Sequence, residues 1–437
     1  MNGALHAYQA ALKRQQPWRW QGRVVESLGQ TVESLGPPAS VGECCTILDQ
    51  AGGGHAAEVI GFRGPHVLSM PLESTEGIRY GDVVQGSGVQ PSFPVGPGLL
   101  GRVLNAVGEP LDNLGPPVVS NRMPLDGTVR APLERVPIKQ PLGTGIRAID
   151  GMLTVGRGQR VGIFGGSGVG KSTLIGMMTR NTEADLTVVG LVGERGREVA
   201  EFLVDALGEN GRARSVLVVS TSDVSPLLRL RAAMAATTVA EYFASQGKHV
   251  LLVLDSLTRF AMAAREIGLA AGEPPTAKGY TPSVFTRLAR LVERSGEFRT
   301  GSITAFYTVL MEGDDQQDPI VDAVRSLLDG HIMLSRGMAS EGWYPPIDVL
   351  DSISRLMPAV AAPEHREDAA LLRRLLSVYA RSEDLVRIGA YKAGSDPDLD
   401  RALQHRPAIR AFLTQRMDET VDLDGVTAKL SQLCAEL

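Results

Sequence analysis

The sequence predicts an α/β protein in three parts: an N-terminal β-barrel, a central domain with a parallel sheet, and a C-terminal helical domain. Three observations support this. Short strand-like runs separated by turns fill residues 22–93. Nearly all-apolar runs alternate with amphipathic stretches over 146–357, and the strand pattern stops after Pro363. Because such apolar strands belong in a parallel sheet covered on both faces, the middle region indicates an α/β domain.

The N-terminal region begins with apolar residues at helical spacing. Residues 1–16 suit one short amphipathic helix that ends before Pro17. A frayed tail is an equally good interpretation, because isolated short helices are marginal in water. The strands that follow are short and closely spaced, which is typical of a small β-barrel or sandwich. Their expected positions are 23–25, 31–35, 45–48, 57–62 and 82–84.

The segment 94–145 is rich in proline and glycine. We interpret it as an ordered entry segment laid over the next domain, with a strand at 99–104; a flexible linker is the alternative. In the α/β region the strands are expected at 160–164, 186–192, 215–219, 249–254 and 302–306, with helices between them. Three further helices are expected at 364–387, 399–415 and 425–437. The predicted domains are an N-terminal helix or tail at 1–20, a barrel at 21–95, an α/β domain at 96–360 and a helical domain at 361–437.

Composition limits the classes of function. The length of 437 residues predicts several domains, and the net charge of −5 argues against a nucleic-acid binder, since such domains are usually basic. Three cysteines without metal-ligand spacing indicate a reducing compartment. Neither a signal peptide nor an apolar run of membrane-spanning length is visible, so we expect a cytoplasmic protein.

A glycine-rich loop gives the strongest functional signal. It fits the pattern G-x-x-x-x-G-K-[ST] without a mismatch, after a strand-like run and before a helix-like one. Glycines allow backbone N–H groups to turn toward phosphate oxygens, and a helix N-terminus favours anions. The loop consists of Gly165, Gly166, Ser167, Gly168, Val169, Gly170, Lys171 and Ser172. Lys171 is long enough to reach the β- and γ-phosphates, and the Ser172 hydroxyl is placed to bind Mg²⁺.

Carboxylates follow two of the predicted strands. The apolar run 249–254 ends at Asp255, the Walker B arrangement that holds a carboxylate beside Mg²⁺ at the carboxyl end of a sheet. Glu194 follows the run 186–192 and could polarise the water that attacks the γ-phosphate. Glu198 and Glu201 are near enough to be alternatives, and a solvated charged loop is the plain structural interpretation.

Three further features have both a functional and a structural interpretation. Arg355 could be an arginine finger that reaches a neighbour's γ-phosphate, or it could belong to a surface ion pair. Tyr344, in a proline-rich turn, could stack on adenine or simply pack into the core. The acidic loop 312–319 could face a central channel or a partner, although most such loops are solvated surface.

Together these motifs resemble the hexameric rotary ATPases related to the subunits of F-type ATP synthase. The segments 272–285, 327–332, and 388–391 followed by 394–397 are most similar to the type III secretion and flagellar export ATPases. Gln316 and Gln317 favour the flagellar branch. The resemblance implies a β-barrel, a RecA-like P-loop ATPase core with a parallel sheet, and a helical C-terminal domain. It covers nearly the whole chain from about Arg23.

The resemblance also implies roles for individual residues. Lys171 would bind phosphate, Glu194 would activate water and Arg355 would be the finger given to the adjoining subunit. Asp255 and Ser172 would serve Mg²⁺. The nucleotide-binding residues would be Gly165, Gly166, Ser167, Gly168, Val169, Gly170, Lys171, Ser172, Thr173 and Tyr344. The implied cofactors are ATP and Mg²⁺.

The implied partners are those of an export motor. They are identical subunits in a homohexamer, a peripheral-stalk-like regulator at the N-terminus, a central stalk protein in the pore, export substrates and chaperones, and the export gate at the membrane. Through the export apparatus the chain would associate peripherally with the cytoplasmic face of the inner membrane. Because one chain carries both Glu194 and Arg355, a homo-oligomer would complete every site at an interface, and a monomer should be a poor ATPase. An injectisome-type ATPase and a catalytic subunit of a rotary ATP synthase are the alternatives. A nucleic-acid translocase and a non-catalytic scaffold fit the sequence less well.

Overall fold

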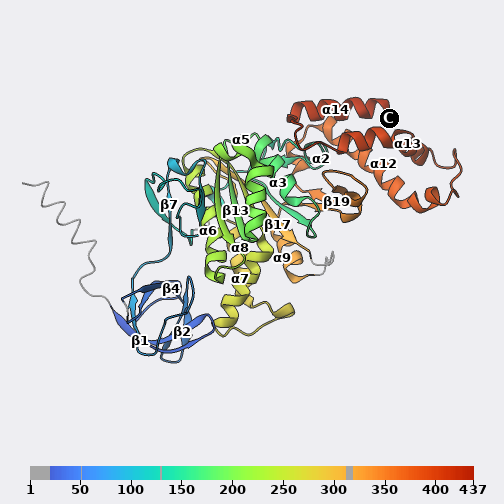
Figure 1. Ribbon diagram of the computed structural model, residues 1–437. Coiled ribbons are helices and arrows are strands. Elements are labelled where there is room, and N and C mark those ends of the chain that lie inside the picture. Colours follow the sequence, from blue (N-terminus) through green and yellow to red (C-terminus); the bar gives the residue numbers. More distant parts are fainter. Residues whose placement is uncertain (1–19, 51, 128–129, 312–317) are drawn as a thin grey trace, which may run out of the picture.

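The computed structural model describes residues 20–50, 52–127, 130–311 and 318–437. Figure 1 shows a small β-domain at one end, a large α/β domain in the middle and a group of helices at the other end. The predicted N-terminal helix lies outside the described residues, and so does most of the acidic loop 312–319. The expected order of barrel, α/β core and helical domain is confirmed.

The N-terminal domain is a closed barrel with the strand order β1-β2-β5-β4-β3-β6, which decides between the expected barrel and sandwich. Its strands are β1 (Gln21–Leu28), β2 (Thr31–Leu35), β3 (Cys44–Leu48), β4 (Gly54–Arg63), β5 (His66–Pro71) and β6 (Val83–Gly86). Residues such as Val24, Val32 and Ile47 fill its core. The sequence prediction missed β5, which closes the ring between β2 and β4.

The central domain is built on a nine-stranded sheet with the order β19-β18-β12-β17-β15-β13-β14-β8, and β16 pairs with β17. The six pairings among β8, β12, β13, β14, β15, β17 and β18 are parallel. The strands are β8 (Val103–Asn105), β12 (Arg160–Gly165), β13 (Leu186–Glu194), β14 (Ser215–Thr221), β15 (His249–Asp255), β16 (Gly296–Glu297), β17 (Ser302–Leu310), β18 (Gly330–Leu334) and β19 (Ile347–Ser354).

The five strands that the sequence predicted are the five at the centre of this sheet. The prediction missed β18 and β19, which pair antiparallel with each other at one edge. β19 alternates buried and exposed residues and carries two aspartates, so it lacks the continuous apolar run of a central strand. The strand expected at 99–104 is wrong in its first half, because Pro97–Leu99 forms a 3₁₀ turn and β8 begins only at Val103.

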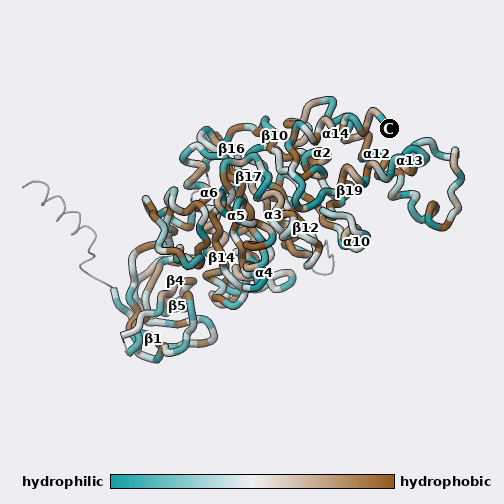
Figure 2. Tube along the Cα trace, turned by 45° about the horizontal axis from the view of Figure 1, so that its top comes forward, coloured by the Kyte–Doolittle hydropathy of each residue, from teal (hydrophilic) through white to brown (hydrophobic). Residues whose placement is uncertain are grey.

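Helices cover both faces of the sheet, as Figure 1 shows. One hydrophobic cluster joins α6 (Pro226–Ser245), α7 (Leu257–Ala270), α8 (Pro282–Val292) and α9 (Pro319–Leu327) to one face. A second joins α2 (Arg147–Met152) and α3 (Lys171–Asn181) to the other. Val188 belongs to the first cluster and its neighbour Val189 to the second, as expected for a strand buried on both sides. In Figure 2 hydrophobic segments, drawn in brown, lie in the region of the central strands.

Short elements complete the central domain. They are the ribbon β7 (Ser92–Val95) with β9 (Asn121–Pro124), the pair β10 (Pro141–Leu142) with β11 (Val155–Gly156), α4 (Gly196–Glu201), η3 (Phe202–Leu207), α5 (Gly208–Ala213), α10 (Arg336–Ser340) and α11 (Met357–Val360). The 3₁₀ turns are η1 (Pro97–Leu99), η2 (Pro132–Glu134) and η4 (Ala277–Gly279). The entry segment is therefore ordered in its described residues.

The C-terminal domain consists of α12 (Pro363–Arg387), α13 (Pro397–Leu413) and α14 (Leu423–Glu436), close to the three expected helices. It packs on the central domain through the second hydrophobic cluster, and the imidazole of His365 is 2.8 Å from the carbonyl oxygen of Gly151 in α2. The segment after α13 lies beside the start of α3, where residues of both line the pocket described below.

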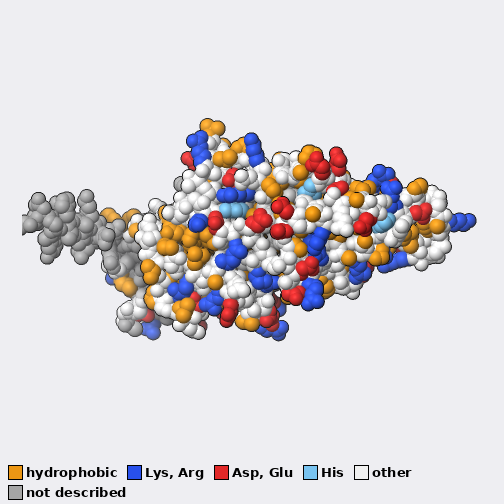
Figure 3. All heavy atoms as spheres, turned by 90° about the horizontal axis from the view of Figure 1, so that it is seen from above, with side chains coloured by type: hydrophobic (Ala, Val, Ile, Leu, Met, Phe, Trp, Pro, Cys, Tyr) orange, Lys and Arg blue, Asp and Glu red, His pale blue; other side chains and the backbone are white. Residues whose placement is uncertain are grey.

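The surface is mixed in charge. Figure 3 shows acidic and basic side chains interspersed over the face seen from above. Among the described residues, no helix combines the length and the hydropathy that a bilayer crossing requires.

Candidate active site

The glycine-rich loop connects the end of β12 at Gly165 to the start of α3 at Lys171. Gly168 and Gly170 have φ angles of 78° and 90°, a left-handed conformation that glycine adopts without steric cost. Among the residues that the structure describes, no side chain caps the N-terminus of α3, so its first backbone N–H groups remain available to an anion. Val169 is buried and anchors the loop. The local structure is therefore that of a phosphate cradle.

Lys171 and Asp255 meet at the carboxyl ends of the central strands. The ammonium nitrogen of Lys171 lies 2.9 Å from Oδ1 of Asp255, which ends β15. The hydroxyl of Thr308 in β17 donates to the same oxygen at 2.6 Å. Asp255 is buried, so its carboxylate needs these partners. The lysine and the aspartate predicted from separate motifs thus form one site, and Ser172 lies exposed beside them at the first turn of α3.

Glu194 ends β13, the strand next to β15. Leu191 is paired with Asp255, which places Glu194 just beyond the carboxyl end of the sheet. Burial, the nearby charge of Asp255 and a hydrogen bond to Glu198 raise the pKa of Glu194 to about 7, while the charge of Lys171 opposes that rise. A carboxyl group with a pKa near neutrality suits acid–base work at physiological pH.

The two alternative glutamates lie in more open surroundings. Glu201 pairs with Arg197 at 2.7 Å, and Glu198 pairs with Arg195 at 3.6 Å. Both side chains are about half exposed, at 50% and 45%, whereas Glu194 is 12% exposed. Of the three carboxylates, Glu194 is the one that shares a buried site with Asp255.

Arg259 adds a cation that the sequence analysis did not single out. It lies in the first turn of α7, with Nε 3.7 Å from Oε1 of Glu194. Both of these atoms are buried without a hydrogen-bond partner in the described part of the chain. Buried polar atoms are normally satisfied, so this pair is poised to bond to a ligand or water between them. Gly193 leaves room for this arginine, because a β-carbon there would lie 3.0 Å from Cδ of Arg259. The φ of Gly193, 69°, also favours glycine.

A pocket of about 810 Å³ adjoins the loop. Tyr344, which is 51% exposed, forms one wall, and a β-carbon at Gly170 would be 3.9 Å from its ring. The segment after α13 forms the opposite wall. The other lining residues include Thr173, Leu174, Met177, Pro346, Thr414, Gln415 and Met417. The pocket has the size and the mixed lining of a small-molecule site, and it lies at a phosphate cradle.

The C-terminal wall of this pocket is held by contacts between residues far apart in sequence. The backbone N–H of Gln415 donates to the carbonyl oxygen of Tyr344 at 2.9 Å, and its side-chain amide donates to that of Gly145 at 2.8 Å. The backbone N–H of Arg147 donates to Oε1 of Gln415 at 2.9 Å, and the Arg147 guanidinium pairs with Glu419. No local signal marks these residues, because Arg147 and Gln415 are 268 positions apart.

Arg355 lies elsewhere. β19 begins at Ile347, near Tyr344, and runs antiparallel to β18 toward the amino ends of the parallel strands. Arg355 follows the last residue of β19, and its backbone N–H donates to the carbonyl oxygen of Asp329. The carboxylate of Asp329 is bonded to Arg160 at the start of β12. The loop of glycines begins at the other end of β12, roughly 16 Å away at about 3.3 Å per residue. The structure therefore separates Arg355 from the other predicted site residues.

Comparisons with known proteins match all three parts of the chain. Residues 24–88 match the beta-barrel domain of the ATP synthase alpha/beta family, and residues 145–354 match the nucleotide-binding domain of that family. Residues 361–432 match the T3SS EscN ATPase C-terminal domain. The flagellum-specific ATP synthase of Pseudomonas aeruginosa is 52% identical over 95% of this chain and 93% of its own length. The type 3 secretion system ATPase of Xanthomonas euvesicatoria is 48% identical over 92% of this chain and 91% of its own.

The chain belongs to the type III secretion and flagellar export ATPase family. It is an ATPase whose nucleotide-binding domain is that of the ATP synthase alpha/beta family. A solved structure of the assembled ATPase EscN from the type III secretion system of enteropathogenic E. coli has a TM-score of 0.90 and 43% identity, covering 94% of this chain and all of that one. EscN in complex with its central stalk EscO gives a TM-score of 0.87 and 42% identity over the same shares.

Within this export ATPase the predicted site residues divide into two groups. Lys171, Glu194 and Asp255 are brought together, Ser172 lies beside them, and Tyr344 borders the adjoining pocket. Arg355 is at the opposite end of the sheet. The sequence analysis missed Arg259 and the C-terminal wall of the pocket. Only Arg259 had a local signal, since it falls one helical turn after the strand that ends in Asp255.

Proposed function

We propose that this chain is the ATP-hydrolysing motor of a flagellar protein export apparatus, acting as a homohexamer in which each catalytic site is shared by two subunits. The observation that carries the proposal is the place of Arg355. It is too far from the phosphate cradle of its own chain to touch a bound nucleotide, and it is exposed at the end of the edge strand β19. A residue so placed is accessible to the site of a neighbouring subunit. The assembled state of EscN supports the same arrangement.

Within one subunit, the proposed roles follow from the geometry above. The loop and Lys171 hold the phosphates, and Lys171 exchanges Asp255 for them when nucleotide binds. Glu194 accepts a proton from the attacking water, and Arg259 beside it helps to hold the transferred phosphoryl group. The finger Arg355 of the adjoining subunit neutralises charge that develops in the transition state.

Mg²⁺ fits this site. The described residues contain no group of three or more His, Cys, Asp or Glu side chains that could cage a metal. Mg²⁺ in nucleotide sites needs only one or two protein oxygens, because phosphates and waters complete its shell. The exposed Ser172 hydroxyl and the Asp255 carboxylate would hold it, and its charge would offset that of the phosphates.

Tyr344 is proposed to stack on adenine. Stacking of a base on an aromatic ring contributes about 1–3 kcal/mol. We therefore expect Tyr344→Ala to raise the KM for ATP roughly 5- to 150-fold at 1.4 kcal/mol per tenfold, with little change in kcat. Tyr344→Phe keeps the ring and should behave as the parent chain. Steady-state kinetics of the two variants measures this, and equal KM values for alanine and phenylalanine would refute the stacking role.

A shared site makes activity depend on assembly. ATPase activity per subunit should rise with protein concentration, in step with the mass measured in parallel by light scattering. At concentrations where the chain is a monomer, activity should be a small fraction of the plateau. An activity per subunit that stays constant while the ring dissociates to monomers would contradict the shared site.

The same proposal extends to the export process. Hydrolysis would energise the unfolding and release of export substrates from their chaperones at an export gate in the membrane. A peripheral-stalk-like regulator would bind the N-terminus. A central stalk would enter the pore, and the complex of EscN with its central stalk EscO supports this.

The identity of 52% with the flagellum-specific relative, against 48% with the type 3 secretion relative, supports the flagellar branch. Restored swimming of a bacterium that lacks its flagellum-specific ATP synthase tests this branch. Failure there, with rescue of an injectisome mutant instead, would favour the injectisome alternative, and ATP synthesis with a partner subunit would favour the rotary synthase.

A further inference from the structure

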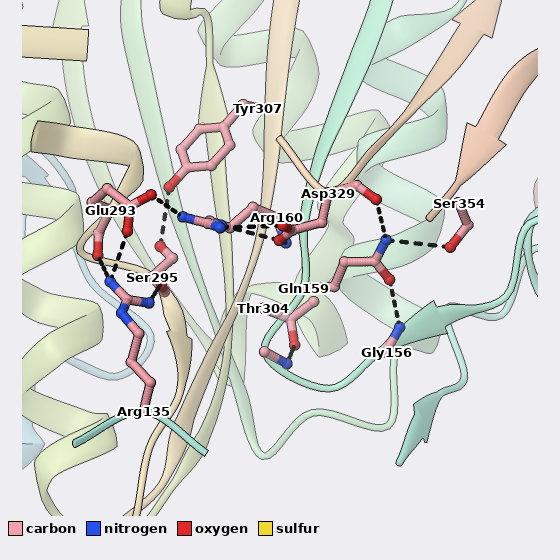
Figure 4. Close-up of polar contacts among 11 residues, drawn as sticks. Arg135, Gly156, Gln159, Arg160, Glu293, Ser295, Thr304, Tyr307, Asp329 and Ser354 are labelled. Carbon is pink, nitrogen blue, oxygen red and sulfur yellow. Dashed lines mark hydrogen bonds and ion pairs between the residues drawn. The ribbon is translucent and has the colours of Figure 1, made fainter. Parts of the chain in front are cut away.

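A dense polar cluster lies at the amino ends of the parallel strands, at the end of the sheet opposite the phosphate cradle. Figure 4 shows Arg160 at its centre, with Asp329 on one side and Glu293 on the other. We use the name finger clamp for four of its residues, Gln159, Arg160, Asp329 and Ser354. The cluster lies at the opposite end of β12 from Lys171 and its partner Asp255, and the functions assigned above give it no role.

Arg160 and Asp329 are joined by four hydrogen bonds. The Arg160 guanidinium donates through Nε and Nη2 to the two oxygens of the Asp329 carboxylate, at 3.0 and 3.1 Å. The backbone N–H of Arg160 donates to Oδ2 at 3.1 Å, and that of Asp329 donates to the Arg160 carbonyl at 2.9 Å. On its other side Arg160 bonds Glu293 at 2.5 Å, and Glu293 in turn accepts from Arg135. A bidentate pair with this many bonds holds the position and orientation of Asp329.

Gln159 links the same point to the end of β19. Its side-chain amide donates to the carbonyl oxygen of Asp329 and to the hydroxyl of Ser354, both at 3.2 Å. Its Oε1 accepts from the backbone N–H of Gly156 at 2.7 Å, which fixes the orientation of the amide. The Ser354 hydroxyl donates in turn to the carbonyl oxygen of Thr154 at 3.0 Å. Gln159 is fully buried, so these bonds are shielded from water.

Arg355 follows directly after Ser354. Its backbone N–H donates to the carbonyl oxygen of Asp329 at 3.0 Å, the same oxygen that accepts from Gln159. Its side chain is exposed, and the guanidinium makes no ion pair with any residue that the structure describes. The backbone of Arg355 is therefore held through Asp329 and through Ser354, while its side chain is exposed.

We propose that the finger clamp is a positioning element for Arg355, which sets the direction in which the arginine leaves its subunit toward the neighbouring site. The inference rests on the proposed role of Arg355 in trans. A finger acts only if its guanidinium meets the transferred phosphoryl group, and a misplacement of about 1 Å can cost about 10²-fold in rate. An exposed, flexible side chain gains that accuracy only from a fixed backbone.

The clamp also sits on the strand that leads to its own subunit's phosphate cradle. β12 runs from Arg160 to Gly165. A substitution in the clamp could therefore impair the catalytic site of the neighbouring subunit, through Arg355. It could instead impair the phosphate cradle of its own subunit, through β12. The two cases differ in which subunit is impaired, and rings of mixed composition separate them.

The test uses Asp329→Asn and, as a smaller change, Ser354→Ala, each in the full chain. Each is expected to lower kcat about 10- to 100-fold with little change in the KM for ATP, because the finger acts in the transition state. Asp112→Asn is the matched control. The Asp112 carboxylate accepts from Arg102 at 2.8 and 3.0 Å and from the Val103 backbone at 3.1 Å, but at the other edge of the sheet. It should lose no more than a few-fold in kcat.

Mixing then decides the direction. Each variant is mixed with Lys171→Ala subunits, whose finger is intact but whose cradle is disabled. If the clamp positions the finger, mixed rings recover activity, since the variant's intact cradle faces an intact finger. If rings of a clamp variant with Lys171→Ala form without regaining activity, while rings of Arg355→Ala with Lys171→Ala do regain it, the clamp inference is wrong. In that case the role of Arg355 as a finger is retained. If neither mixture recovers, the finger itself is wrong. Should Asp329→Asn fail to fold, Ser354→Ala decides alone.

Discussion

Arg355→Ala is expected to lower kcat by about 10³–10⁵, the range that an arginine finger contributes to phosphoryl transfer. Nucleotide binding and ring mass should be unchanged, because Arg355 is remote from its own cradle and exposed. Single-turnover and steady-state rates measure the loss, and equilibrium binding of an ATP analogue measures what is kept. Arg381→Ala removes an exposed arginine whose hydrogen bond, in the described part of the chain, goes to Ser377 of its own helix, and it should have no effect.

Because Arg355 is proposed to act on the neighbouring subunit, a complementation experiment is decisive. A ring of Arg355→Ala subunits lacks every finger, and a ring of Lys171→Ala subunits lacks every cradle. In mixed rings some interfaces join an intact cradle to an intact finger, so activity should return. Mixed rings that are shown to form and yet stay inactive would mean that Arg355 does not act in trans.

Glu194→Gln is expected to lower kcat by about 10²–10⁴, since general-base assistance contributes that much. The amide keeps the size of the side chain and removes its ability to accept a proton. ATP should still bind, because the phosphates are held by the loop and Lys171. Glu201→Gln is the matched control, since Glu201 is an exposed carboxylate on the adjoining helix. Loss of nucleotide binding in Glu194→Gln would instead assign Glu194 a structural role.

The pKa of Glu194 adds a pH dependence with a definite sign. Burial first, and the charge of Asp255 second, raise it to about 7. The proposed base must be deprotonated, so kcat/KM should fall as the pH decreases through about 7 and level off above it. The pH profile of kcat/KM measures this, and Glu194→Gln should remove the inflection. An unchanged inflection in that variant would assign it to another group.

Local patterns were enough for the chemistry of the cradle. The phosphate-binding loop consists of consecutive residues, Gly165 to Ser172. It can be identified from the sequence because glycine backbone freedom and a helix N-terminus are properties of neighbouring positions. The strand that ends at Asp255 was equally legible, since a central parallel strand is apolar throughout. The edge strand β19 lacks such a run, because it alternates buried and exposed residues, and the short β18 beside it was missed as well. Arg355, which follows β19, therefore had no assigned place in the fold.

Other parts of the site exist only in three dimensions. The wall of the pocket depends on Arg147 and Gln415, and the bond of Thr308 to Asp255 joins neighbouring strands that are remote in sequence. Which of Glu194, Glu198 and Glu201 is buried could not be inferred from spacing, because it depends on the register of β13 against β15.

The sequence alone predicted the order of barrel, nucleotide-binding core and helical domain, and it identified the phosphate-binding loop. It could do so because the hydrophobic period and the turn residues that mark these features act over a few neighbouring positions. The tertiary structure decided that Lys171, Glu194 and Asp255 share one buried site while Arg355 lies roughly 16 Å away along β12. Parallel strands bring together the residues that follow them, and an antiparallel edge strand carries its last residue to the opposite end.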